Sequence, residues 1–151
     1  MTLRRRRPGL VYPVNEDWHY VGDTGEPDWY DPGSGDAWEN ASASEFGLAF
    51  RLRETGIVDI EGNVEATSDP PSNGYLFQLP VGYRPSSLFI GSSTGATTGG
   101  DLVPVKVAVY SSGFVEVLLA HPDPYPVPGG TDALASVALA LQVFLTPSSA
   151  P

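Results

Sequence analysis

Two neighbouring stretches of strict apolar alternation limit this chain to a β-sheet. Between residues 103 and 110 valine fills every odd position, and residues 114–120 repeat the pattern. Because successive side chains of a strand point to opposite faces, each stretch has one apolar face. Ser111, Ser112 and Gly113 separate the two stretches, and glycine can adopt the positive φ of a tight turn. The pattern therefore predicts a β-hairpin.

A second hairpin is predicted from residues 46–53 and 56–66, which flank Glu54 and Thr55. In the second of these stretches the bulky apolar residues share one face and most acidic residues share the other. An antiparallel sheet with one buried and one wet face has this alternation. Gly62 interrupts the apolar row and indicates a bulge.

Residues 132–145 are compatible with two structures. Their alanines and leucines favour a helix, for which Thr131 would be the N-cap. Alternation favours a strand, because one face holds Val137, Leu139, Leu141, Val143 and Leu145, and the opposite face holds Ser136, Ala138, Ala140 and Gln142. A period of two is that of a strand, so we predict a strand with one bulky face and one small face.

Residues 76–86 predict a short strand that ends in a rigid corner. Leu76 and Phe77 form its apolar centre, and Pro80 and Pro85 follow within a few residues. Proline cannot donate a ladder hydrogen bond, which confines this backbone to a strand end or a sheet edge. Residues 87–90 then predict another short strand, and the small, polar residues 91–100 predict a loop.

Composition supports an all-β chain that lacks thiol chemistry. The 151 residues include 17 glycines and 15 prolines, which favours turns over long helices. The absence of cysteine excludes disulfides and thiolate metal sites. No apolar run reaches the roughly 20 residues of a membrane-spanning helix. Pro8 and Gly9, rather than an apolar run, follow Arg4 to Arg7, so we expect neither a signal peptide nor membrane insertion.

Charge is divided unevenly between an N-terminal arm and the rest of the chain. The net charge is −10, but from residue 8 onward 4 basic residues stand against 18 acidic ones, which gives −14. This body should repel nucleic acid and anionic membranes, whereas Arg4 to Arg7 should attract acidic partners. We therefore expect the arm to dock on an acidic protein or on phosphate, and we do not expect nucleic acid as a partner of the body.

Residues 8–45 are acidic, contain no lysine or arginine, and yet hold all three tryptophans of the chain. A disordered acidic linker would be poor in aromatic residues. We predict an extended, irregular strap whose rings pack on the chain's own sheet or on another subunit, or form a stacking platform for a sugar. The predicted organisation is an arm and strap over residues 1–45, a β-sandwich domain over 46–147 and a tail over 148–151.

The corner FQLPVGYRPS at residues 77–86 resembles the LPxGYRP corner of small β-sandwich domains in bacteriophage tail fibres and minor tail proteins. Other stretches of that resemblance follow in order, namely WHYVG and GEP within 18–27, WEN, FRL and GIVDIEG within 38–62, and VAVYSSGFVEV at 107–117. The resemblance implies an antiparallel, jelly-roll-like sandwich, a homotrimer and a place on the surface of a virion. It also implies synthesis in the host cytoplasm without secretion, and it implies no catalytic residue.

Three sets of residues are predicted to make contacts with partners. Virion docking is assigned to the arm and the tryptophans, that is Arg4, Arg5, Arg6, Arg7, Trp18, Trp29 and Trp38. A subunit interface is assigned to the small face of the last strand and to the corner, that is Ser136, Ala138, Ala140, Tyr83 and Arg84. Contacts with the host surface are assigned to loops, because loops carry recognition on a rigid scaffold. The loop residues are Asn73, Gly74, Ser93, Thr94 and Thr97.

Few residues indicate catalysis or metal binding. Residues 91–95 match G-x-S-x-G, but that nucleophile motif needs a helix after it, where a loop is expected here. His19 and His121 lack metal-ligand spacing, and the aspartates between 23 and 36 lack the calcium-loop pattern, although loop carboxylates can still coordinate calcium. We predict no catalytic residue, no cofactor and no metal.

Three functional classes follow from these predictions. The favoured class is a non-enzymatic, trimeric phage tail domain that contacts other virion proteins, itself and a host cell-surface glycan. The second class is a capsid decoration protein that clamps capsid subunits. The third class, a small carbohydrate depolymerase or esterase, lacks a recognisable nucleophile and base.

Overall fold

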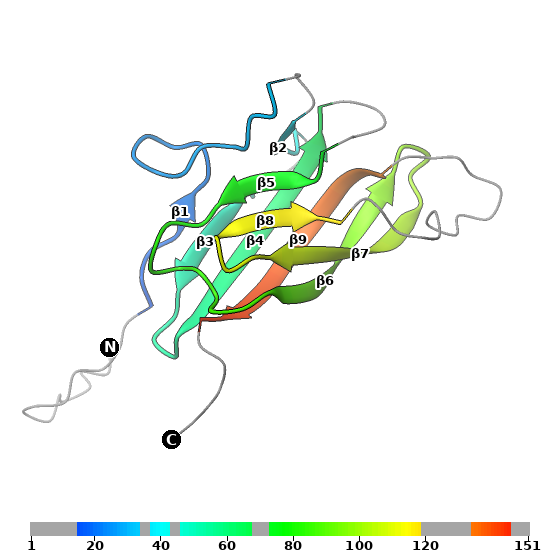
Figure 1. Cartoon of the computed structure of the whole chain (residues 1–151). Helices are drawn as coiled ribbons and strands as arrows, with labels where there is room; N and C mark the ends of the chain where they lie inside the picture. The colour runs from blue at the N-terminus through cyan, green and yellow to red at the C-terminus, as the bar shows by residue number, and fades with distance from the viewer. Residues whose placement is uncertain (1–14, 34–36, 43–45, 68–72, 119–133, 146–151) are drawn as a thin grey trace, which may run out of the picture.

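The computed structural model describes residues 15–33, 37–42, 46–67, 73–118 and 134–145 (Figure 1). Within these residues the chain forms nine β-strands and no helix. In chain order the strands are β1 (His19–Tyr20), β2 (Trp38–Asn40), β3 (Ala49–Leu52), β4 (Ile57–Ala66), β5 (Tyr75–Gln78), β6 (Phe89–Thr97), β7 (Leu102–Val109), β8 (Phe114–Val117) and β9 (Leu134–Phe144).

All nine strands belong to one antiparallel sheet. Its order is β1-β3-β4-β9-β6-β7-β8-β5, and β2 pairs with β4 outside this path. The sheet curls so that its two ends approach each other, as a half-barrel (Figure 1). Phe50 of β3 and Phe77 of β5 stack with ring centroids 5.7 Å apart, and Trp38 Nε1 of β2 donates a 2.6 Å hydrogen bond to the carbonyl of Asn73.

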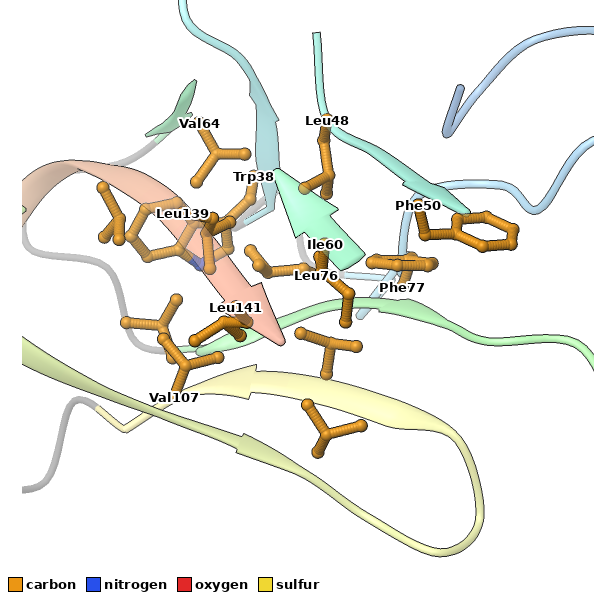
Figure 2. Packing of buried hydrophobic residues seen from close by; sticks show 14 of the residues in the cluster. Trp38, Leu48, Phe50, Ile60, Val64, Leu76, Phe77, Val107, Leu139 and Leu141 are labelled. Carbon is orange, nitrogen blue, oxygen red and sulfur yellow. The ribbon is translucent and has the colours of Figure 1, made fainter. Parts of the chain in front are cut away.

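The core fills the inside of the curled sheet. Its largest fully buried side chains are Trp38, Phe50 and Phe77, and Figure 2 shows the last two lying against each other. Burying one large apolar side chain stabilises a fold by about 1.5–3 kcal/mol. The all-β, antiparallel prediction is confirmed in the form of one curled sheet, while the jelly-roll-like sandwich and the homotrimer stay predictions.

Both predicted hairpins are present. In β7 and β8 the odd-numbered valines are buried, and Gly113 turns between the strands with φ of 97°. In the other hairpin Arg53 and Gly56 close the turn between β3 and β4 through hydrogen bonds of 2.8 and 3.0 Å. The strand prediction for 132–145 is also confirmed, since β9 buries Val137, Leu139, Leu141 and Val143.

The loop predicted over residues 91–100 is wrong, because β6 runs from Phe89 through Thr97. Two glycines explain how so small and polar a segment becomes a central strand. A Cβ at Gly91 would lie 2.8 Å from Leu141 Cδ2, and one at Gly95 would lie 2.5 Å from Leu134 Cδ1. Bulky side chains of β9 therefore lie over β6 where β6 has none, so the apolar cover comes from its neighbour and not from its own sequence.

Ser93 lies in the middle of β6, and its Oγ is buried without a hydrogen-bond partner among the described residues. A buried hydroxyl that has lost its water is a cost to folding. We therefore expect Ser93→Ala to raise the free energy of unfolding by about 1 kcal/mol. Urea denaturation of the two proteins measures this difference, and a variant less stable than the parent would contradict it.

Gly62 pairs with Leu139 of β9 in continuous register, so the bulge predicted there does not occur in this pairing. A different constraint explains the glycine. Its φ is 142°, and a Cβ at this position would lie 2.5 Å from the Cα of Leu48 and 2.7 Å from the carbonyl oxygen of Gly47. The backbone that precedes β3 thus crosses β4 too closely for any side chain at this position.

Candidate functional site

The outer face of the sheet, opposite the core, carries unusually small side chains on β9. Ala138 and Ala140 are exposed there, because they alternate with the buried Val137, Leu139 and Leu141. Ala138 pairs with Asn63 of β4 on one side and with Thr94 of β6 on the other. Short side chains flanked by longer ones leave this surface hollowed along β9.

Two hollows lie side by side on this outer face. The first has a volume of about 520 Å³ and is lined by residues that include Trp18, Tyr20, Phe46, Glu61, Asn63 and Ala140. The second has a volume of about 480 Å³, and its lining includes Phe46, Asn63, Thr94, Leu102, Ser136 and Ala138. Phe46 and Asn63 line both, so the two hollows adjoin. Volumes of this size are typical of ligand sites.

Apolar side chains stand exposed around the hollows. Phe46 is 74% exposed, Leu102 77% and Tyr20 45%. Single exposed apolar residues need no explanation, but a group of them around one depression marks an interaction surface. The outer face over β4, β9 and β6 is therefore the candidate functional site, and we call it the outer groove.

An ion-pair cluster borders the outer groove. Asp59 of β4 is 3% exposed although it faces outward, and it accepts hydrogen bonds from Arg51 Nε at 3.3 Å and from Arg53 Nε at 2.8 Å and Nη2 at 2.7 Å. The Asp59 carboxylate raises the pKa of Arg53. The Arg51 guanidinium in turn lies 4.4 Å from the centroid of the Trp18 ring, a cation–π contact. These contacts hold Trp18 at the margin of the first hollow.

A second polar cluster holds the N-terminal segment on the sheet. His19 Nδ1 lies 3.0 Å from both carboxylate oxygens of Glu26, and His19 Nε2 lies 3.1 Å from Glu16 Oε2. Tyr83 OH donates a 2.7 Å hydrogen bond to the same Glu16 oxygen. The His19 ring stacks on Phe50 with centroids 5.2 Å apart. We call these four residues, Glu16, His19, Glu26 and Tyr83, the His19 cluster.

The His19 cluster shifts the pKa of three of its members. The hydrogen bond to Glu26, with further help from Glu16, raises the pKa of His19 against the opposing effect of burial. Burial would raise the pKa of Glu16, but hydrogen bonds from Tyr83, His19 and the Leu52 amide outweigh it and lower that pKa. Burial and the hydrogen bond to Glu16 raise the pKa of Tyr83 to about 12. At neutral pH Tyr83 therefore remains a hydrogen-bond donor.

The structure separates the predicted subunit-interface residues into two groups. Ser136, Ala138 and Ala140 all lie in the outer groove. The corner residues instead contact their own chain, since Tyr83 belongs to the His19 cluster and Arg84 Nε donates a 2.7 Å hydrogen bond to the Leu79 carbonyl. Of these five residues Ala138 and Ala140 are exposed, whereas Ser136, Tyr83 and Arg84 are half-buried.

The predicted docking and host-contact residues are scattered. Trp38 is 2% exposed in the core, so the structure corrects its assignment as a docking anchor, and Trp29 packs partly buried against that core. Gly74 is buried, because the position of its missing Cβ lies against the Val117 carbonyl. Thr97 is also buried, at the end of β6. These two residues cannot contact a host surface.

The remaining host-contact residues do not lie in the exposed loops that were predicted for them. Ser93 and Thr94 lie within β6, and of these Thr94 lines the second hollow. Asn73 is half-buried, and its carbonyl accepts the hydrogen bond from Trp38. Arg4 to Arg7 lie outside the described residues. The matched G-x-S-x-G sequence lies within β6 and forms no strand-to-helix elbow.

Neither polar cluster was predicted, but a signal existed for one of them. In a hairpin whose turn joins Arg53 to Ile57, residue 51 stands opposite residue 59, so Arg51 and Asp59 could have been paired. The His19 cluster joins residues 16, 19, 26 and 83 from segments that no local pattern connects.

Comparisons with known proteins give no further assignment. No family model, curated protein or solved structure matches the chain. Within the described ranges, no group of three or more histidine, cysteine or acidic side chains is arranged to hold a metal ion. The same residues contain no helix long and apolar enough to cross a membrane.

Proposed function

We propose that this chain is a non-enzymatic structural protein of a bacteriophage virion, exposed on the particle surface as a trimeric minor tail or tail-fibre-like domain. Its partners would be further copies of itself, other virion proteins to which the N-terminal arm docks, and a glycan of the host surface. The virion context of the proposal comes from a resemblance. The corner at residues 77–86 and the ordered motifs around it resemble domains of phage tail fibres and minor tail proteins. The return of β5 toward β3 supports a sandwich-like classification of the sheet.

One observation carries the assembly part of the proposal. Around the second hollow, the exposed Phe46 and Leu102 flank Ser136 and Ala138, which have almost no side chain. A protruding apolar group beside a shallow hollow suits a ring assembly, because the group of one copy can fill the hollow of the next copy around a threefold axis. Small residues also let a second backbone approach closely. We therefore assign the subunit interface to the second hollow.

Placing a large charge in this hollow should prevent assembly. We expect the parent protein to be a trimer at micromolar concentration and Ala138→Arg to be a monomer, because an arginine would both fill the hollow and bring a charge into an apolar contact. Light scattering coupled to size exclusion measures both masses. Val81→Arg is the matched control, since Val81 is 83% exposed in the turn after β5. A parent that is monomeric, or an Ala138→Arg variant with the parent's mass, would count against this interface.

Electron microscopy of intact particles, with gold-labelled antibody against the chain, tests the virion assignment. Label at the tail would support the minor tail or tail-fibre proposal. Label spread over the head would instead indicate the capsid decoration class. Particles without label would refute the virion proposal.

A further inference from the structure

The first hollow of the outer groove combines aromatic walls with a small floor. Trp18, Tyr20 and Phe46 stand around it, and Gly62 and Ala140 lie among its lining residues. Phe46 belongs to the proposed subunit interface, so the rings left free for a ligand are Tyr20, which is exposed, and Trp18, which is half-buried. Aromatic side chains offer flat apolar area at low conformational cost, and tyrosine and tryptophan add a polar group at the edge. Such walls suit a ligand that has flat apolar faces.

The ring of Trp18 and the backbone of Tyr20 are held in position before any ligand arrives. Trp18 is placed by the cation–π contact with Arg51, whose guanidinium is itself held by the buried Asp59. Tyr20 belongs to β1 and pairs with Ala49 of β3. A site whose groups are already in position loses less freedom on binding, which raises its affinity.

The charge of the hollow restricts the ligand further. Among the described residues that line the hollow, Glu61 is the one carboxylate and none is a lysine or arginine. The chain from residue 8 onward also has a net charge of −14. An anionic ligand would therefore be repelled. A ligand with hydroxyl groups would gain charge-assisted hydrogen bonds to Glu61.

From this combination we infer that the first hollow binds an uncharged carbohydrate, with sugar rings against Tyr20 and Trp18 and hydroxyl groups donating to Glu61. A neutral sugar has apolar C–H faces and a rim of hydroxyls, and the volume of about 520 Å³ is of the size of a ligand site. The inference rests on the proposed function, whose host-glycan contact it locates. It moves that contact from the predicted loops to the outer face of the sheet.

The test uses the purified full-length protein and three oligosaccharides of equal length. These are a neutral hexose oligomer, an N-acetylhexosamine oligomer and a uronic-acid oligomer, each titrated by calorimetry. We expect at least one of the two uncharged oligomers to bind and the uronic-acid oligomer not to bind. Tyr20→Ala and Glu61→Gln should each weaken binding by about tenfold, the equivalent of one lost favourable contact. Tyr20→Phe, which keeps the ring, should stay within about twofold of the parent.

Several results would overturn the inference. They are no heat of binding with either uncharged oligomer at millimolar concentration, stronger binding of the uronic acid, or unchanged affinity in Tyr20→Ala. Circular dichroism establishes that each variant is folded, and Val81→Ala controls for changes at an unrelated exposed residue. The two proposals can fail separately. If the purified protein binds an uncharged oligomer but particles carry no label, the proposed function is refuted and the carbohydrate site stands. If particles carry label but the purified protein binds no sugar, the carbohydrate site is refuted and the virion proposal stands.

Discussion

Gly62→Ala is expected to lower the free energy of unfolding by about 3 kcal/mol or more. Two costs add at this position. A φ of 142° is one that residues with a Cβ rarely adopt, and the new Cβ would lie 2.5 Å from the Leu48 Cα. Leu48 belongs to the backbone directly before β3, and Gly62 belongs to β4. Neither backbone can move without disturbing the pairing of β3 with β4.

The two costs can be separated with a matched variant. Gly56 also has a positive φ, of 77°, but no atom lies within 4 Å of the position of its missing Cβ. Gly56→Ala should therefore cost only the backbone strain, about 1 kcal/mol. Urea denaturation of the parent and both variants gives the comparison. Equal destabilisation by the two substitutions would show that the close approach of residues 47 and 48 to β4 does not restrict the sequence.

The strands that the sequence predicted correctly are those that carry their own pattern. The valines of β7 and β8 and the bulky residues of β9 alternate in the sequence as they alternate between core and surface. The alternation was also enough to choose strand over helix for 132–145, against the helix propensity of alanine and leucine. Tertiary context added little to these strands beyond the partner each one pairs with.

Only the start of β6 falls within the strand predicted over 87–90, and the rest escaped prediction because its apolar cover is contributed by other strands. Leu134 and Leu141 of β9 and Val105 of β7 occupy the space beside Gly95 and Gly91. A pattern that depends on Leu134 and Leu141, which lie far along the chain from β6, is invisible in a local window. The same reasoning applies to Asp59, which the alternation assigned to the wet face, whereas Arg51 and Arg53 cover it in the fold.

The candidate site was predictable only in part, for similar reasons. The small face of β9 could be predicted, because alternation separates Ala138 and Ala140 from the bulky positions. The aromatic walls could not be placed, since Trp18, Tyr20 and Phe46 reach the outer groove from segments with little regular structure. The outer groove therefore depends on the place of β1 at the edge of the sheet and on the residues before β3 that cross β4.

The His19 cluster should make stability depend on pH in a defined window. His19 has a raised pKa, so its contribution is fully present below its ordinary value of 6.5 and is lost as pH rises through the raised value. Glu16 has a lowered pKa, so its contribution is present above its ordinary value of 4.5 and is lost as pH falls through the lowered value. The cluster therefore stabilises the fold most between pH 4.5 and 6.5.

His19→Gln removes the charge and should lower the free energy of unfolding by about 1.5 kcal/mol at pH 5.5, the size of a hydrogen bond to a charged group. The difference from the parent should shrink as pH rises through the raised pKa of His19, because the parent's His19 then loses its charge as well. Denaturation in urea at pH 5.5, 7.5 and 9 measures the trend.

Tyr83→Phe is the control in the same experiment, because it removes a hydrogen bond of the His19 cluster and keeps the aromatic packing. It keeps the ring against Phe50, whose centroid lies 5.1 Å away, and removes the hydrogen bond to Glu16. Because the pKa of Tyr83 is about 12, this tyrosine does not titrate in the tested range, and the loss should be nearly the same at pH 5.5 and pH 9. A His19→Gln loss that is equally constant would mean that His19 stabilises the N-terminal segment by its shape and its stacking on Phe50, without its charge.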